Sequence, residues 1–178
     1  MMQGRVDLTV TVEQGEFRVS DRSGEVLSTV LGSCVAVCLY DPKLMLGGMN
    51  HFLLPFGQGS GADRPLRYGI FAIESLVNAL MKAGAQRSRL EAKVFGGARI
   101  TANRLDIGRI NAAFAKEFLA TEGIALVGES LGGSNARRVV FRPTTGQARL
   151  LIVPSTAVAV DPPLSAAKSA GQTEIELF

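Results

Sequence analysis

Two short apolar segments separated by a turn limit the possible fold more than any other feature of this chain. Val35–Tyr40 and Met49–Leu54 are apolar, and each has the length of a buried strand. Between them, Asp41-Pro42-Lys43-Leu44 has Asp at the first and Pro at the second position of a turn. The sequence therefore predicts an antiparallel β-hairpin.

This hairpin brings a cysteine and a histidine together. If it is symmetric about the Pro42-Lys43 peptide, Cys34 lies directly opposite His51, which is the only histidine of the chain. Opposed residues share a face, with Cβ atoms about 4.5–5.5 Å apart, so a thiol and an imidazole there can share a proton. A proline-containing type I turn suits a two-residue loop poorly, and Gly47-Gly48 favours a bulge, so a register shifted by one residue is the alternative.

The two cysteines have different expected roles. Cys38 lies inside the apolar segment and is expected to be a small buried side chain. Cys34 follows Gly32-Ser33 at the beginning of the strand, where backbone N–H groups can point at a ligand, so Cys34 is a candidate nucleophile. A Cys34–Cys38 disulfide is excluded within one strand, because four residues at about 3.3 Å each exceed bridging distance.

Cofactor and metal motifs are absent from the sequence. Two cysteines and one histidine lack the fourth ligand and the CxxC spacing of a zinc site. The Gly96-Gly97 pair has neither the lysine of a P-loop nor the spacing of a dinucleotide motif. We therefore predict no metal and no cofactor.

Composition excludes several classes of protein. The 178 residues are 47% hydrophobic and suit one domain with a real core. No apolar run approaches the roughly 18 residues of a membrane span, and the N-terminus lacks the layout of a signal peptide. The net charge of +3 is scattered, which argues against nucleic-acid binding, and two unpatterned cysteines suit a reducing cytosol.

The rest of the chain predicts an α+β fold in which mixed or antiparallel sheets are layered with two main helices on one side. We predict one domain over residues 1–153 and a disordered Ala-, Ser- and Pro-rich tail over 154–178, with a frayed end preferred to a docking peptide at 174–178. Two further hairpins are predicted, one of Leu8–Val12 and Phe17–Val19 around Gln14-Gly15 and one of residues 137–141 and 147–153. Helices are predicted from residue 67 or 68 to 83 and at 107–122, and strands at 90–95 and 124–128. The loop at Pro55–Pro65 either contacts substrate or only connects two elements.

At the hairpin the sequence resembles a known family. LGSCVAVCLYD at residues 31–41, followed by GGMNHFLLP at 47–55, is similar to the CheD family of chemoreceptor glutamine deamidases. The resemblance runs from about residue 15 to 153 and includes Glu91–Ala98, the Ile107–Asn111 region and Gly132-Gly133, followed by Arg137, Val139, Phe141 and the Thr145-Gly146 turn. Ser130, preceded by Glu129, departs from the family, whose members usually carry Asp two residues before the glycine pair.

The resemblance implies a fold akin to other Cys-His hydrolases, including deamidating toxins, and a cytoplasmic enzyme. Its substrate would be a glutamine on a cytoplasmic helix of a methyl-accepting chemotaxis receptor, and a CheC-type chemotaxis phosphatase would be a second partner. Cys34 would attack the carboxamide, and His51 would take the thiol proton. Thr29, or alternatively Ser28, would orient the imidazole ring, while the turn from Gly32 and Ser33 to the nucleophile would supply oxyanion donors.

Two other classes of function are consistent with the residues. One is a Cys-His amidase, or a transglutaminase-like enzyme, that acts on another protein. The other is a non-catalytic adaptor that binds a chemotaxis receptor or phosphatase. Ammonia release without an added amine separates hydrolysis from transfer, and a functional Cys34→Ala variant would favour the adaptor.

Overall fold

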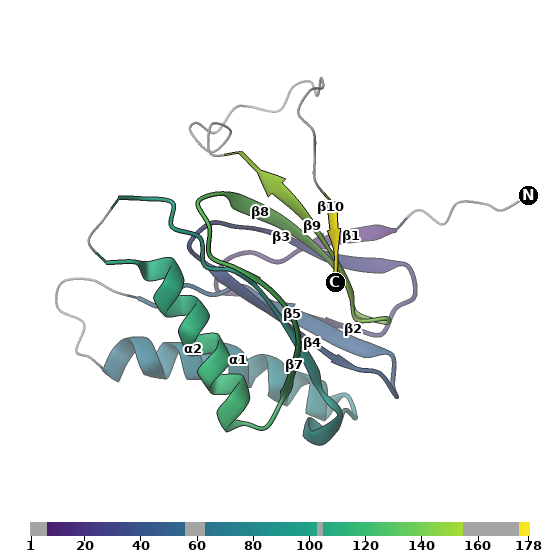
Figure 1. Cartoon of the computed structure of the whole chain (residues 1–178). Helices are drawn as coiled ribbons and strands as arrows, with labels where there is room; N and C mark the ends of the chain where they lie inside the picture. Colours follow the sequence, from purple (N-terminus) through teal and green to yellow (C-terminus); the bar gives the residue numbers. More distant parts are fainter. Residues whose placement is uncertain (1–6, 56–62, 103–104, 155–174) are drawn as a thin grey trace, which may run out of the picture.

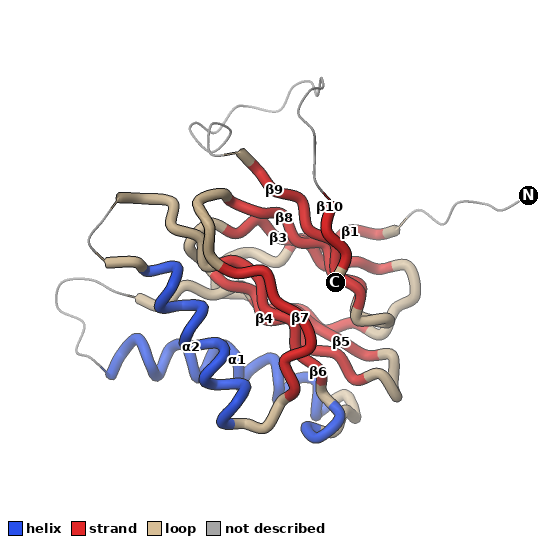
Figure 2. Tube along the Cα trace, viewed as in Figure 1, coloured by secondary structure: helices blue, strands red, loops and turns tan. Residues whose placement is uncertain are grey.

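The computed structural model describes residues 7–55, 63–102, 105–154 and 175–178, and it has three layers. Two sheets face each other, and two helices cover the outer face of one of them (Figure 1). This arrangement confirms the predicted α+β class with two helices on one side. Figure 2 separates the helical layer from the strands by colour.

The first sheet has the strand order β1-β3-β8-β9-β10, and the second has the order β2-β5-β4-β6-β7. Both sheets mix parallel and antiparallel pairs, because β1 runs parallel to β3 and β6 runs parallel to β7. The elements are β1 (Leu8–Thr11), β2 (Phe17–Ser20), β3 (Glu25–Leu31), β4 (Val35–Asp41), β5 (Leu46–Asn50), α1 (Asp63–Lys82), a 3-10 turn (Arg87–Arg89), β6 (Glu91–Gly96), α2 (Ile107–Thr121), β7 (Ala125–Leu131), β8 (Ala136–Arg142), β9 (Gln147–Val153) and β10 (Ile175–Leu177).

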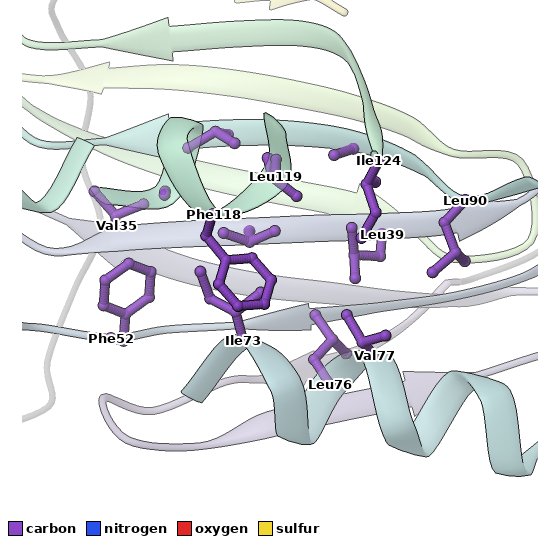
Figure 3. Packing of buried hydrophobic residues seen from close by; sticks show 14 of the residues in the cluster. Val35, Leu39, Phe52, Ile73, Leu76, Val77, Leu90, Phe118, Leu119 and Ile124 are labelled. Atoms are coloured by element: carbon purple, nitrogen blue, oxygen red, sulfur yellow. The ribbon is translucent and has the colours of Figure 1, made fainter. Parts of the chain in front are cut away.

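Strand β4 separates two hydrophobic cores, because its side chains alternate between its faces. Val35, Val37 and Leu39 face the helices, where they pack with residues of α1 and α2 such as Ile73 and Phe118 (Figure 3). The intervening side chains of β4 enter the space between the two sheets, and Cys38 is fully buried there. The expectation that Cys38 is a core residue is confirmed.

Both helices begin and end close to the predicted positions, with two differences. Helix α1 starts at Asp63, so Pro65 belongs to its first turn and not to a loop. Proline is tolerated there because the N–H groups of the first turn have no partner within the helix. The spacing of Ile110, Phe114 and Phe118 predicts the buried face of α2. Phe118 is buried there, together with Gly108, Asn111, Ala112, Ala115 and Leu119, whereas Ile110 and Phe114 are only partly buried and pack against the core.

The predicted hairpin of residues 8–12 and 17–19 is wrong. Both strands exist, but β1 pairs with β3 in the first sheet and β2 pairs with β5 in the second. The local alternation of side chains was read correctly, but it does not specify the partner of a strand. The segment between β1 and β2 therefore crosses from one sheet to the other.

The predicted register of the central hairpin is also wrong, by two residues. Cys38 pairs with Met49 and Asp41 with Leu46, so the loop has four residues and not two. The Leu44 N–H donates to the Asp41 carbonyl, as in a type I turn, and Met45 follows with φ of 52°. A type I turn needs these extra residues to join twisted strands, since the two-residue loop prefers the mirror-image turns.

The prediction for the C-terminal tail fails at its end. Residues 155–174 lie outside the described residues, but Ile175–Leu177 forms β10 and pairs antiparallel with β9. The terminal Phe178 packs against the core between the sheets, with its ring 5.9 Å from that of Phe95. One partly buried aromatic side chain and the backbone hydrogen bonds of this strand pair explain why this end is ordered.

Candidate active site

The chain crosses between the sheets a third time at residues 32–34, between β3 and β4, and this crossing positions Cys34. Three consecutive carbonyls accept hydrogen bonds there: Gly32 from the Ala98 N–H (2.9 Å), Ser33 from the Asn111 side chain (2.8 Å) and Cys34 from the Gly97 N–H (2.8 Å). Within the described part of the chain, the Ser33 N–H has no hydrogen-bond partner, and the Cys34 N–H has none apart from its own thiol. The crossing thus fixes the backbone and leaves these two donors beside the thiol.

Glycine at position 96 makes this crossing possible. Gly96 has φ of 109°, and a Cβ there would lie 2.2 Å from the Cys34 carbonyl oxygen. On the other side of the turn, a Cβ on Gly108 would lie 2.4 Å from the Ala98 oxygen. No larger residue permits both approaches, so these glycines place the nucleophile segment against β6 and α2.

Asn111 links the nucleophile segment to the segment that follows the histidine. It is fully buried on α2, donates from its side-chain nitrogen to Ser33 and accepts the Leu54 N–H at 3.0 Å. One side chain therefore holds both halves of the site. The resemblance included Asn111 in a motif, but no local pattern in the sequence indicated these contacts.

Cys34 and His51 lie on one face of the sheet, although they are not directly opposed. Val35 and Phe52 bridge the two segments with two backbone hydrogen bonds of 2.9–3.0 Å. Cys34 and His51 each precede a bridging residue, so they are diagonal neighbours on the opposite face. Such neighbours are about 7–8 Å apart, within reach of a long or aromatic side chain. A register shift of two residues preserves the face, whereas a shift of one would have separated the pair.

Thr29, and not Ser28, contacts the imidazole ring. The Thr29 hydroxyl donates to the Val12 carbonyl at 2.8 Å and lies 2.8 Å from His51 Nδ1. Because its proton is already used, the hydroxyl accepts from Nδ1–H, and the Val12 carbonyl, 3.3 Å from Nδ1, can only accept as well. Nδ1 therefore carries the proton, and Nε2 keeps a lone pair. Nε2 is buried and has no hydrogen-bond partner among the described residues.

Burial keeps the Cys34 thiol and the His51 imidazole neutral. It raises the pKa of the Cys34 thiol above its ordinary value, although the residue's own backbone N–H partly offsets the rise. Burial also lowers the pKa of His51, opposed by the Val12 carbonyl and the charge of Glu13. The resting pair is thus a thiol and a neutral imidazole, and proton transfer must accompany attack on a substrate. Burial raises the pKa of Cys38 far more, which leaves that thiol inert.

Sequence reasoning missed a side chain that contacts the nucleophile. The oxygen of the Gln14 carboxamide lies 3.5 Å from Cys34 Sγ and accepts the thiol hydrogen bond. The sequence identified Gln14 only as a turn residue, because nothing local indicated that the turn crosses between the sheets.

Ser130, the departure from the family pattern, contacts Arg137. Arg137 is 4% exposed, and its guanidinium donates to the carbonyl and the hydroxyl of Ser130, and to the Gly132 carbonyl. Burial lowers the pKa of Arg137, and Glu176 on β10 opposes this effect. The serine therefore helps to solvate a buried cation at the glycine pair.

Two cavities lie beside the nucleophile segment. A cavity of about 50 Å³ borders Ser33, and a second of about 240 Å³ lies between Gly97 and Gly133, with Arg99 and Asp106 lining both. Among the described residues, no three His, Cys, Asp or Glu side chains are grouped to hold a metal ion. No helix in the same residues has the length and apolar character needed to cross a membrane.

Comparison with known proteins identifies the family. A family model described as CheD chemotactic sensory transduction matches residues 53–151, which is more than half of the chain. This chain belongs to the CheD family. The match begins just after His51, and an alignment with one CheD relative, from a Caulobacter species, extends over 96% of the chain at 47% identity and covers 93% of that relative.

Other CheD relatives are equally similar. A protein of Acidiphilium cryptum is 50% identical over 157 residues, covering 86% of this chain and 80% of its own length. One of Rhizobium meliloti is 54% identical over 143 residues, covering 79% and 78%. These two and the Caulobacter protein carry the name "Probable chemoreceptor glutamine deamidase CheD". Among solved structures, the hypothetical protein YfiH of Bacillus licheniformis superposes on 72% of this chain and 61% of its own, with 16% identity and a TM-score of 0.45.

Proposed function

We propose that this chain is a chemoreceptor glutamine deamidase in which Cys34 is the nucleophile and His51 the general base. The observation that supports this assignment of roles is the contact between His51 Nδ1 and the Thr29 hydroxyl, 2.8 Å apart. With Nδ1–H held by Thr29, Nε2 keeps the lone pair that would accept the thiol proton. The names of relatives that are 47–54% identical support the substrate class.

The reaction follows from this geometry. Cys34 loses its proton to His51 Nε2 as Sγ bonds to the glutamine carboxamide carbon, and the carbonyl electrons move to oxygen. The N–H groups of Ser33 and Cys34, which have no backbone partner among the described residues, would stabilise that oxyanion. The imidazolium returns the proton to the departing ammonia and leaves a thioester. A water molecule deprotonated by His51 then hydrolyses the thioester to glutamate.

The small cavity beside Ser33 favours a protein substrate. A small-molecule amidase encloses its ligand in a pocket of about 300–1,000 Å³, whereas the cavity bordering Ser33 is about 50 Å³. A glutamine side chain that projects from a receptor helix can reach a thiol at such a surface. This substrate places the enzyme in the cytoplasm, where those helices lie.

A CheC-type chemotaxis phosphatase is the second partner that we propose, on the strength of the family resemblance. It would compete with the receptor for the surface around Cys34. Adding a receptor fragment to the complex with the phosphatase should therefore displace the phosphatase, and simultaneous binding would contradict shared use of this surface.

Ammonia release tests the reaction class. The protein is incubated with a chemoreceptor cytoplasmic fragment, with and without a primary amine, and ammonia and peptide masses are measured. Deamidation predicts ammonia and glutamate in both cases. Incorporation of the amine would indicate a transglutaminase-like enzyme, and binding without conversion would indicate an adaptor.

A further inference from the structure

Gln14 brings a carboxamide to the nucleophile of an enzyme whose substrate is itself a carboxamide. The side chain is exposed, and its oxygen lies 3.5 Å from Cys34 Sγ. It therefore occupies the solvent side of the thiol, which is the side from which a substrate must arrive. No step of the mechanism above uses it.

Backbone hydrogen bonds fix the loop on both sides of Gln14. Before it, the Val12 N–H donates to the Ser28 carbonyl at 2.9 Å. After it, the Gly15 N–H donates to the His51 carbonyl at 2.7 Å, and the His51 N–H donates to the Glu16 carbonyl at 3.1 Å. The Cα of Gln14 is thus held relative to the histidine, and its carboxamide is held near the thiol by the fold.

The contact matches a hydrogen-bonding role better than that of an internal substrate. Attack on Gln14 would require the sulfur to approach the carbonyl carbon from above the amide plane. The recorded contact is instead between sulfur and oxygen, with the thiol as donor. In the resting site, Gln14 therefore acts as an acceptor for the Cys34 proton.

During the reaction, the position of the Gln14 carboxamide requires a hydrogen-bond donor in place of the acceptor of the resting site. Once the thiol proton has moved to His51, Gln14 has no donor to accept from, and a negative oxygen forms on the carbon that is now bonded to Sγ. A carboxamide offers N–H donors at its other end, and rotation about its soft terminal torsion exchanges the two ends. Sγ is bonded to the tetrahedral carbon, so a donor that contacts Sγ lies close to the oxygen on that carbon.

We propose that Gln14 is a catalytic residue whose side-chain N–H group donates to the oxyanion, together with the backbone N–H of Cys34. This inference rests on the proposed deamidase function. It adds a side-chain donor to an oxyanion site otherwise built from backbone, and it assigns a reason for the crossing between β1 and β2.

The test compares the kinetics of wild type, Gln14→Ala and Gln14→Glu on a chemoreceptor fragment. Gln147→Ala is the matched control, because Gln147 is also an exposed glutamine but lies on β9. We expect Gln14→Ala to lower kcat by roughly 100- to 1,000-fold with little change in KM, as for loss of an oxyanion donor. Gln14→Glu should be at least as slow, because its carboxylate cannot donate and repels the oxyanion.

Three results would overturn the proposal. A wild-type rate in Gln14→Ala would show that the side chain is not used, and a faster rate with a lower KM would show that Gln14 blocks the site as a pseudosubstrate. Glutamate at position 14 in purified wild type, but not in Cys34→Ala, would show that Gln14 is itself deamidated. If wild type fails to deamidate the fragment, the proposed function fails; if it succeeds and Gln14→Ala matches it, only this inference fails.

Discussion

Replacing Thr29 by Val isolates the contribution of its hydroxyl to catalysis. The two side chains have nearly the same shape, and Thr29 is 3% exposed, so the substitution deletes hydrogen bonds without opening a cavity. The Val12 carbonyl loses one donor but keeps His51 Nδ1 at 3.3 Å. We therefore expect a loss of about 0.5–1.5 kcal/mol in the free energy of unfolding, as for one neutral hydrogen bond.

The catalytic loss comes from the change in this hydrogen bond as His51 gains charge. A neutral hydrogen bond contributes about 0.5–1.5 kcal/mol and a charged one about 1.5–3 kcal/mol, and only the difference of about 1–1.5 kcal/mol acts on kcat. At about 1.36 kcal/mol for each tenfold change in rate, Thr29→Val should lower kcat roughly 5- to 13-fold.

Initial rates of glutamate formation on a receptor fragment, measured by peptide mass, would test this value. Thr29→Ser keeps a hydroxyl and should stay near the wild-type rate, while Ser28→Ala changes the neighbouring residue, whose hydroxyl shows no hydrogen bond to His51. The reasoning is refuted if Thr29→Val retains more than about one third of the wild-type rate, or if Ser28→Ala is the slower variant.

Three further predictions follow from the same contacts. Asn111→Asp cannot donate to the Ser33 carbonyl, so its kcat should fall. The fall should be much larger than in Asn50→Asp, a control that is equally buried and whose side chain bridges Val37 and Ala72. Equal losses of kcat in the two variants would show that Asn111 has only a structural role. Since burial lowers the pKa of His51, kcat/KM should stay level from neutral pH down to about 6.5 and fall only below it, and a fall beginning above pH 7 would contradict this. Gly96→Ala should lose about 1–3 kcal/mol from backbone strain alone, and unchanged thermal unfolding would contradict the close approach to Cys34.

Apolar patterning predicted the layers and the faces of this protein. The length of each apolar segment distinguished strands from helices, and the position of Cys38 inside such a segment predicted its burial. Cys34 and His51 were correctly expected on one face, because the side-chain period of two survives a register shift of two.

The errors concern partners that local sequence does not specify. The left-handed conformation of Met45 lengthens the central turn, and methionine gives no signal of it. Nothing in Leu8–Thr11 indicates that it pairs with β3, and so the approach of Gln14 to the nucleophile was missed. Asn111 bridges segments that are 57 and 78 residues away along the chain, a contact that only the folded structure reveals.

Site-resolved mass spectrometry of a receptor fragment, treated with variants of the two cysteines, tests the central claim most directly. Cys34 lies partly exposed on the face of His51, whereas Cys38 is buried four residues further along the chain, in β4, with an inert thiol. The account predicts that wild type and Cys38→Ala convert receptor glutamine to glutamate, and that Cys34→Ala and His51→Ala do not. Conversion by Cys34→Ala at the wild-type rate would contradict the role of Cys34 as nucleophile.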